Sequence, residues 1–123
     1  MSLLDVNPEG LSKTVGCLET ARCQHSTCEI DLADKKKIDQ FWARLDAESP
    51  PDILVNNAGV YPMEGYLDVD EEFLEKVFNV NMKSAFWMCE NFIRLRKERG
   101  ASPSTSLPLR QFCRSKRTWC TMA

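Results

Sequence analysis

The chain has 123 residues, of which 43% are apolar and 28% are charged, and its formal net charge is −2. This size allows one small domain, and so low a net charge provides no field that would attract nucleic acid. No apolar run approaches the about 20 residues that cross a bilayer, and the first residues lack the features of a secretory signal, so we expect a cytoplasmic protein that binds neither nucleic acid nor membranes.

The first half of the chain alternates between strand-like and helix-like segments. Residues 2–6 form a short apolar run that ends before a proline, which predicts a strand followed by a turn. Apolar residues recur at helical spacing over 9–22, and residues 26–32 are predicted to form a second strand. Asp34 is a candidate N-cap for a helix that extends to about residue 47, where Ser-Pro-Pro ends it.

The second half begins with a third strand at 52–55, which is almost wholly apolar, as expected of a parallel strand buried on both faces. A long helix is predicted from Asp70 to about Arg99, with acidic residues at its start and basic residues at its end that complement the helix dipole. Strands that alternate with helices of this length form βα units. The fold class predicted for residues 1–100 is therefore α/β, with a doubly wound parallel sheet.

Candidate binding residues follow each of the three strands. Ligands bind beyond the carboxyl ends of the strands in such sheets, so we expect these residues to share one crevice. They are Asp5, the pair Asp31 and Leu32, and the tetrapeptide Asn56, Asn57, Ala58 and Gly59. In a dinucleotide-binding fold, a carboxylate at the position of Asp5 accepts hydrogen bonds from the adenosine ribose and repels a 2′-phosphate, which favours NAD over NADP. The alternative is an ordinary aspartate before a turn.

The segment Asp-Ile-Leu-Val-Asn-Asn-Ala-Gly-Val at 52–60 resembles the fourth-strand signature of the classical short-chain dehydrogenases/reductases. Val-Phe-Asn-Val-Asn at 77–81 resembles the helix motif that carries the family's catalytic asparagine, here Asn81, and Asp31-Leu32 resembles the pair that contacts adenine. The motifs follow the family order over residues 1–100. The alternatives are a simple turn after the third strand and a solvent-facing Asn81, although asparagine is disfavoured in the middle of a helix.

This resemblance implies a Rossmann fold, an NAD(P) cofactor and hydride transfer between an alcohol and a carbonyl. In the family, the small residues of 56–59 let the backbone approach the cofactor, and the residue at Asn81 holds a water in a proton relay. Two parts of the family pattern are absent: the glycine-rich Thr-Gly-x-x-x-Gly-x-Gly turn and the Tyr-x-x-x-Lys pair. Neither Tyr61 nor Tyr66 is followed by a lysine four residues later.

These absences predict a partial Rossmann fold that lacks the first strand and the C-terminal half of the family and is inactive by itself. In the family's sheet, the first strand lies between the strands that correspond to residues 3–6 and 53–55. We therefore expect an empty slot between these two strands, with an unpaired edge on each side. Such edges predict a marginally stable or aggregation-prone fold.

Residues 101–123 differ in character from the rest of the chain. The resemblance predicts an apolar strand here, but a polar segment with prolines is followed by basic residues. A disordered polar tail and a short basic patch for nucleic acid are two interpretations. We prefer a third, in which an irregular tail is translated out of frame, because compatible codons in a shifted frame can encode the missing strand as Gly-Val-x-Val-Asn-Val-Ser-Ser.

The six cysteines include no Cys-x-x-Cys pair. Cys23, His25 and Cys28 come closest to a metal cluster, but their spacing matches no standard zinc pattern and a fourth ligand is not evident. Reduced thiols in small apolar positions, such as Cys17 and Cys28, fit a reducing compartment better. We expect no metal site.

Three hypotheses of function follow from the sequence. The favoured one is an inactive fragment of an NAD(P)-dependent oxidoreductase. The second is a non-catalytic interaction protein that docks on full-length relatives, or on a second copy of itself, through the long helix at 70–99. The third is a complete enzyme whose sequence is known only in part. The sequence does not indicate a substrate.

Overall fold

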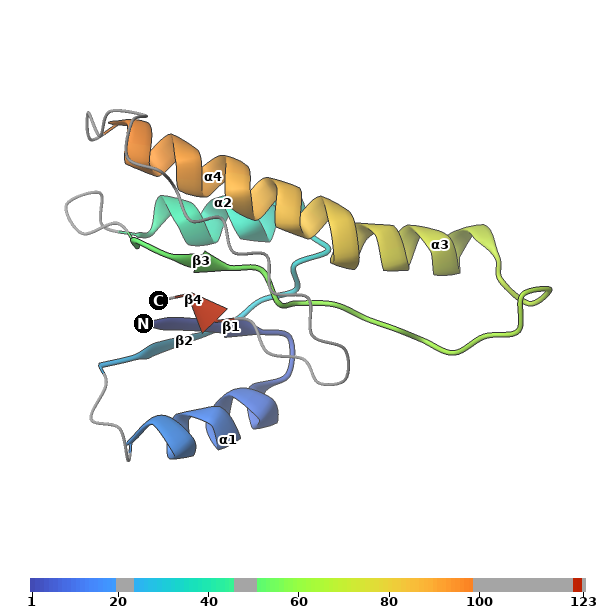
Figure 1. Cartoon of the computed structure of the whole chain (residues 1–123), viewed down its shortest axis with the longest axis horizontal. Helices are drawn as coiled ribbons and strands as arrows, with labels where there is room; N and C mark the ends of the chain where they lie inside the picture. Colours follow the sequence, from blue (N-terminus) through green and yellow to red (C-terminus); the bar gives the residue numbers. More distant parts are fainter. Residues whose placement is uncertain (20–23, 46–50, 99–120, 123) are drawn as a thin grey trace.

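The computed structural model describes residues 1–19, 24–45, 51–98 and 121–122 (Figure 1). Strands and helices alternate along the chain in the order predicted for βα units. The elements are β1 Ser2–Asp5, α1 Pro8–Glu19, β2 Ser26–Glu29, α2 Lys35–Ala43, β3 Leu54–Val55, α3 Glu71–Phe78, the π-turn η1 Asn79–Lys83, α4 Ser84–Glu98 and β4 Thr121–Met122.

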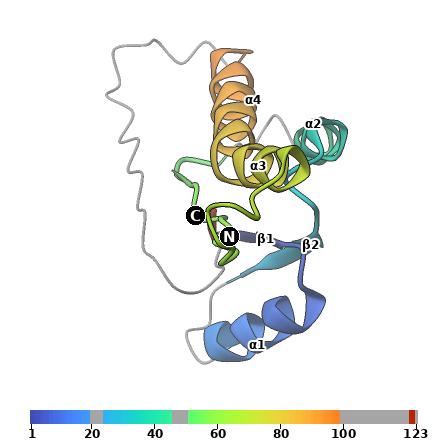
Figure 2. The ribbon, with the colours of Figure 1, turned by 90° about the vertical axis from the view of Figure 1, so that its right-hand side faces the viewer.

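The strands form one four-stranded sheet in the order β2-β1-β4-β3. β1 and β2 are parallel, with Ser2 opposite Ser26 and Asp5 opposite Glu29, whereas β4 is antiparallel to both of its neighbours. α1 lies on one face of the sheet, and α2 and α4 lie on the other (Figures 1 and 2). The predicted α/β class is therefore confirmed in a partial, doubly wound form.

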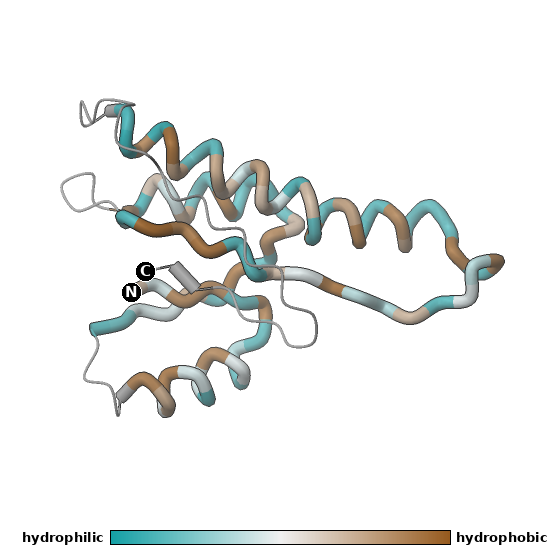
Figure 3. The backbone as a smooth tube through the Cα atoms, viewed as in Figure 1, coloured by the Kyte–Doolittle hydropathy of each residue, from teal (hydrophilic) through white to brown (hydrophobic). Residues whose placement is uncertain are grey.

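The main core lies between the sheet and helices α2 and α4. Leu3 and Leu4 of β1 are both buried, although adjacent side chains of a strand point to opposite faces, so β1 is covered on both sides. Trp42 contacts Phe92 edge to face, and its Nε1 donates to Met88 Sδ at 3.3 Å. Figure 3 shows the apolar stretch of β3 beneath the helices. The core cluster consists of Leu4, Ile30, Leu32, Ile38, Phe41, Trp42, Leu54, Met88 and Phe92.

Aspartate side chains cap the helices of this layer. Asp34 accepts a hydrogen bond from Lys36 N at 2.9 Å, which confirms the predicted N-cap of α2. Asp70 accepts one from Phe73 N at 2.8 Å and caps α3 in the same way. Each cap satisfies a backbone N–H that has no partner within its own helix.

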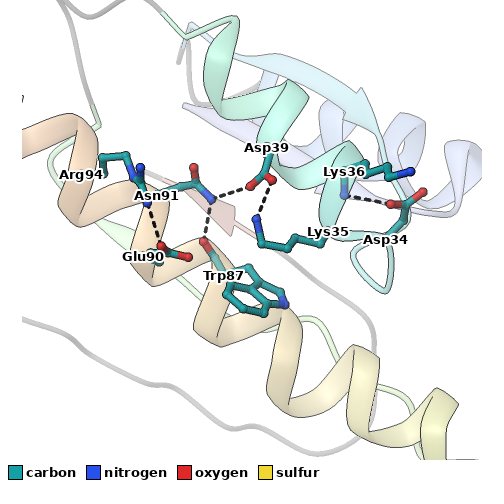
Figure 4. Close-up of polar contacts among 8 residues, drawn as sticks. All are labelled: Asp34, Lys35, Lys36, Asp39, Trp87, Glu90, Asn91 and Arg94. Atoms are coloured by element: carbon teal, nitrogen blue, oxygen red, sulfur yellow. Dashed lines mark hydrogen bonds and ion pairs between the residues drawn. The ribbon is translucent and has the colours of Figure 1, made fainter.

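Polar contacts join α2 to α4 above the core (Figure 4). Lys35 Nζ lies 2.6 Å from Asp39 Oδ2, and Asn91 Nδ2 donates to Asp39 Oδ1 at 3.1 Å and to Trp87 O at 3.0 Å. The hydrogen bond from Lys35, and after it the one from Asn91, hold the pKa of the Asp39 carboxyl below its ordinary value. Asn91 therefore links the two helices through one carboxylate.

Several element boundaries differ from the sequence prediction. β2 ends at Glu29 rather than residue 32, and β3 begins at Leu54 rather than residue 52, although Leu32 still reaches the core. The long helix is present, but the π-turn η1 divides it into α3 and α4. Periodicity reports which residues face the core and not where backbone pairing stops, so the burial is predicted better than the ends of the strands.

The predicted empty slot between β1 and β3 is wrong. β4 occupies it and pairs with the first two residues of β1 on one side and with both residues of β3 on the other. Two facing strand edges leave backbone N–H and C=O groups without partners, and a segment of the same chain satisfies them. Residues 99–120 and 123 lie outside the described part of the chain, as do the predictions for them.

Candidate functional site

The segment from Asn56 to Gly59 leaves the sheet directly after β3 and is fastened to the helix layer. Asn56 Nδ2 donates to Cys89 Sγ on α4 at 3.2 Å, and Ala58 packs against the core cluster. Asn57 between them is partly buried. The tetrapeptide is thus held against α4 and the core, and its contact with a cofactor stays a prediction.

Asn81 holds the residue that follows this segment. Its Oδ1 accepts a hydrogen bond from Val60 N at 2.7 Å, and its Nδ2 donates to Val60 O at 2.8 Å. One side chain thus pairs both backbone groups of a residue 21 positions earlier in the chain. We call this pair of bonds the Asn81 clasp. A side chain that merely faced solvent would not make it, although Asn81 is itself exposed.

The Asn81 clasp lies within the π-turn η1. Ser84 N donates to Asn79 O, five residues earlier, as a π-turn requires. In an α-helix that amide would pair with Val80 O, and here the Ser84 hydroxyl donates to Val80 O instead. Ser84 is buried. It compensates locally for the interrupted helix, and π-turns of this kind are frequent at functional sites.

Gly59 lies next to the Asn81 clasp, but the space around it does not require a glycine. A Cβ added at Gly59 would lie 3.4 Å from Asn81 Oδ1, at the near limit of ordinary van der Waals contact. The glycine therefore leaves room beside the asparagine. Its small size is suited to close approach by another group, but the described structure alone tolerates a methyl group there.

Asp5 organises the turn between β1 and α1. Its Oδ1 accepts a hydrogen bond from Asn7 N at 2.9 Å, and Asn7 Oδ1 accepts from Glu9 N at 3.0 Å and Gly10 N at 3.1 Å. These bonds satisfy amides at the start of α1. The turn-forming alternative for Asp5 therefore describes what the structure shows, and contact with a ribose stays a prediction.

Asp31 and Leu32 follow β2 and have separate surroundings. Asp31 Oδ1 accepts a hydrogen bond from Ala33 N at 2.9 Å, which forms the turn before α2. Leu32 is buried in the core cluster. The adenine contact predicted for this pair stays a prediction, and the Leu32 side chain serves the core.

The predicted site residues fall into two groups. The segment after β3 and Asn81 are in direct contact, as the Asn81 clasp shows. Asp5 ends β1 and Asp31 follows the neighbouring strand β2, and Ile30 N donates to Asp5 O at 3.0 Å. β4 separates β1 from β3 in the sheet, so the two groups lie on opposite sides of the slot. The sequence analysis did not identify the buried Ser84. The signal was its position three residues after the motif at 77–81.

The cysteine predictions have different outcomes. Cys28 packs against the core cluster as predicted, whereas Cys17 is exposed because the buried side of α1 is the one that carries Leu11. Cys23 lies outside the described residues, so the arrangement of Cys23, His25 and Cys28 is not described as a whole. Among the residues with described positions, no three potential metal ligands come together.

The fold and the Asn81 clasp define a partial Rossmann-type α/β domain. Residues 1–102 match the family model of the short-chain dehydrogenases, and the chain belongs to this family. Carbonyl reductase [NADPH] 2 of Sus scrofa is 36% identical over 75 residues, which are 61% of this chain and 30% of the reductase. 2,3-Dihydro-2,3-dihydroxybenzoate dehydrogenase of Bacillus subtilis is 34% identical over 87 residues, which are 70% of this chain and 33% of the dehydrogenase.

Solved structures agree with this assignment. A 4-hydroxyisoleucine dehydrogenase mutant complexed with NADH and succinate is 25% identical and superposes with a TM-score of 0.68, covering 80% of this chain and 39% of that one. A short-chain dehydrogenase of Leptospira borgpetersenii with bound NAD+ is 28% identical, with a TM-score of 0.58 over 62% of this chain and 30% of that one.

The chain spans about a third of the length of the curated relatives above. It is therefore similar to one part of a short-chain dehydrogenase/reductase domain, as the predicted fragment requires. The solved relatives include nicotinamide cofactors, which identifies the class of cofactor that the family uses. None of the helices among the described residues combines the length and the apolar character needed to cross a bilayer.

Proposed function

We propose that the segment described here belongs to an NAD(P)(H)-dependent oxidoreductase that transfers hydride between an alcohol and a carbonyl, and that the chain by itself is inactive. The Asn81 clasp is the observation that carries this proposal. It fixes the segment after β3 to the long helix at the place where the family motifs predict cofactor and catalytic residues. An ordinary turn beside an ordinary helix would need neither a buried Ser84 nor a π-turn.

In this proposal, the part of the cofactor site beyond β3 consists of Asn56, Asn57, Ala58 and Gly59. The adenine contacts Asp31 and Leu32. The nicotinamide supplies the hydride chemistry when it is bound. Both polar atoms of the Asn81 side chain are used by Val60. The structure therefore supports a positioning role for this side chain.

Asp5 favours NAD in the proposed enzyme. Its carboxylate follows β1, where it would meet the ribose hydroxyls and repel a 2′-phosphate. The relatives point both ways, since one is named for NADPH and another has bound NAD+. In the longer product that carries this segment, an Asp5→Asn variant should narrow the preference for NADH over NADPH in kcat/KM. An unchanged preference in this variant would show that Asp5 does not select between NADH and NADPH.

The chain alone lacks the groups that move the proton. Tyr61 and Tyr66 are 90% and 93% exposed, and the residues four positions later are Gly65 and Asp70. Neither phenol is therefore followed by the lysine of the family's Tyr-x-x-x-Lys pair. We expect the purified chain to oxidise neither NADH nor NADPH in the presence of a carbonyl compound.

The deciding experiment is to sequence the transcript that contains this segment and to assay its product. If the transcript encodes the glycine-rich turn upstream and Tyr-x-x-x-Lys downstream, its product should oxidise NAD(P)H with a panel of aldehydes and ketones. An Asn81→Ala variant should lose most of that activity, while a Gln40→Ala variant, at an exposed position of α2, should keep it. A product with both motifs and no activity would contradict the proposal.

A second candidate function is docking through the long helix, and one observation favours it. Leu74, Phe78, Met82 and Phe86 recur at a spacing of four and are 47%, 49%, 61% and 63% exposed. The π-turn winds more residues per turn than an α-helix, which helps to keep this apolar stripe on one side across α3 and α4. Contiguous exposed apolar surface marks interaction sites.

The docking candidate is tested by association with a full-length short-chain dehydrogenase/reductase or with a second copy. A Phe78→Ser/Phe86→Ser variant should weaken an association measured by analytical ultracentrifugation. Leu67→Ser is the matched control, because Leu67 is 94% exposed but lies outside the stripe. If both variants associate like the unchanged chain, the stripe does not dock.

A further inference from the structure

The slot between β1 and β3 is one strand wide and is paired on both sides. β4 is antiparallel to β1 and to β3, so the two outer strands run in the same direction. Ser2 and Leu54 both lie opposite Met122, and Leu3 and Val55 both lie opposite Thr121. A single extended segment therefore completes the hydrogen bonding of two strand edges at once.

The side chains around the filled slot are buried. Leu3 and Leu4 of β1 are 2% and 0% exposed, and Leu54 of β3 is 8% exposed. These residues keep the two edges in place from above and below the sheet. Any strand that enters the slot gains backbone pairing on both sides, whereas a strand added to the outer edge at β2 would gain it on one side only.

The segment that fills the slot is short and is reached by a long connection. β4 has two residues, and residues 99–120 separate it from the end of α4 at Glu98. A connection of this length can span at most about 80 Å when fully extended, which is enough to reach the slot of a neighbouring molecule. Closing a connection of this length within one chain has an entropic cost that grows slowly with length.

We propose that the slot is a strand-acceptor site and that two copies of the chain exchange β4, each filling the slot of the other. The proposal is independent of the oxidoreductase function. The exchanged strand makes the same backbone pairs in the partner as in its own chain, so the exchange costs no contacts. Pairing within one chain benefits from an effective concentration in the millimolar range, so exchange increases with protein concentration.

Two variants of the full chain, each with one added cysteine, test the exchange. One carries Ser2→Cys and the other Met122→Cys, and these positions are opposite each other in the β1–β4 pair. Neither variant can form the 2–122 disulfide within one molecule. In an oxidised mixture of the two, the mixed disulfide should form and increase with concentration, and peptide mass spectrometry distinguishes it from links to the native cysteines.

The control replaces the acceptor position. Leu67 is 94% exposed and forms no part of β1, β3 or β4, so a link from Leu67→Cys to Met122→Cys reports random collision. We expect at least about tenfold more of the 2–122 link than of the 67–122 link. A second pair, Val55→Cys with Thr121→Cys, repeats the test on the other side of β4.

A double variant completes the test. The double variant Ser2→Cys/Met122→Cys should form the 2–122 link within one molecule when dilute and between molecules when concentrated. If the link stays within one molecule at every concentration, or the mixed pairs give no more product than the control, exchange does not occur. If neither the single nor the double variants form the link, β4 does not occupy the slot, and the proposal is overturned.

Discussion

The two faces of the sheet are packed to very different degrees. On the face covered by α2 and α4, helices and strands share a continuous buried cluster, and the Asn81 clasp fastens the segment after β3 to the same long helix. On the other face, α1 buries Leu11, and a hollow of about 540 Å³ opens between α1 and β2. The stability of the fold and the geometry of the candidate site therefore both depend on the long helix that contains α4.

Removing a core side chain from the α2–α4 face should have the largest effect. Ile38 of α2 is fully buried, so Ile38→Ala removes packed methylene groups and leaves a cavity. We expect a loss of about 2–5 kcal/mol in the free energy of unfolding, measured by urea denaturation and circular dichroism. A loss of that size leaves little of the stability typical of a small domain.

The matched change on the other face is Leu11→Ala. Leu11 is 8% exposed and borders the hollow, so its neighbours hold it less completely and a smaller cavity results. We expect a loss clearly below that of Ile38→Ala. Equal losses from the two variants would show that the two faces of the sheet contribute equally to the free energy of unfolding.

The Asn81 clasp connects the α2–α4 face to the candidate site, so its removal should have the second-largest effect. Asn81→Ala leaves Val60 N and Val60 O without their partners, which costs about 1–3 kcal/mol where water does not replace them. Hydrogen exchange of the Val60 amide should become faster by a larger factor than exchange of amides in α1. Asn57→Ala is the control, and similar exchange at Val60 in both variants would show that the clasp does not hold the segment.

The sequence predicts the parts of this face that depend on local pattern. Asp34 could be identified as an N-cap because its side chain needs only the next turn of the helix, and Ile38, Phe41 and Trp42 follow from periodicity. The segment at 56–59 and Asn81 could be identified through family motifs. Their direct contact could not, because Val60 and Asn81 are 21 residues apart and meet only in the folded chain.

Two further features depend on tertiary structure and were not predictable from pattern. In the π-turn, the buried Ser84 hydroxyl donates to Val80 O in place of a backbone N–H, and a serine in a helix does not by itself indicate this. Thr121 and Met122 carry no strand pattern, and they form β4 because the facing edges of β1 and β3 need partners. Absent strands leave edges, but the sequence does not state which segment will fill them.

A methyl group at Gly59 should have a smaller effect than loss of the clasp. The added Cβ would lie 3.4 Å from Asn81 Oδ1, and alanine also lowers the entropy of the unfolded chain relative to glycine. We expect Gly59→Ala to change the free energy of unfolding by less than about 1 kcal/mol in either direction. Gly59→Val adds branches beside the clasp and should cost more. If Gly59→Ala were as harmful as Asn81→Ala, the segment would be packed more tightly than the structure indicates.

The smallest expected effect is the pH dependence of the contact between α2 and α4. Because Lys35 and Asn91 lower the pKa of Asp39, the folded chain binds a proton at this carboxyl less readily than the unfolded chain. The contact thus contributes its full stability above the ordinary aspartate pKa of about 3.9 and loses it as the pH falls through the lowered value. The contribution is small, since the Asp39 side chain is 44% exposed and solvent screens its interaction with Lys35.

An NMR titration of the Asp39 carboxyl checks the direction of this shift. The midpoint should lie below that of an ordinary aspartate, and Lys35→Gln should move it upward, because the Lys35 hydrogen bond is the largest cause. Asn91→Ala should move it upward by less. The difference in unfolding free energy between the unchanged chain and Asp39→Asn should be constant near neutral pH and shrink on acidification. A midpoint at or above the ordinary value would show that α2 and α4 are joined by the apolar core alone.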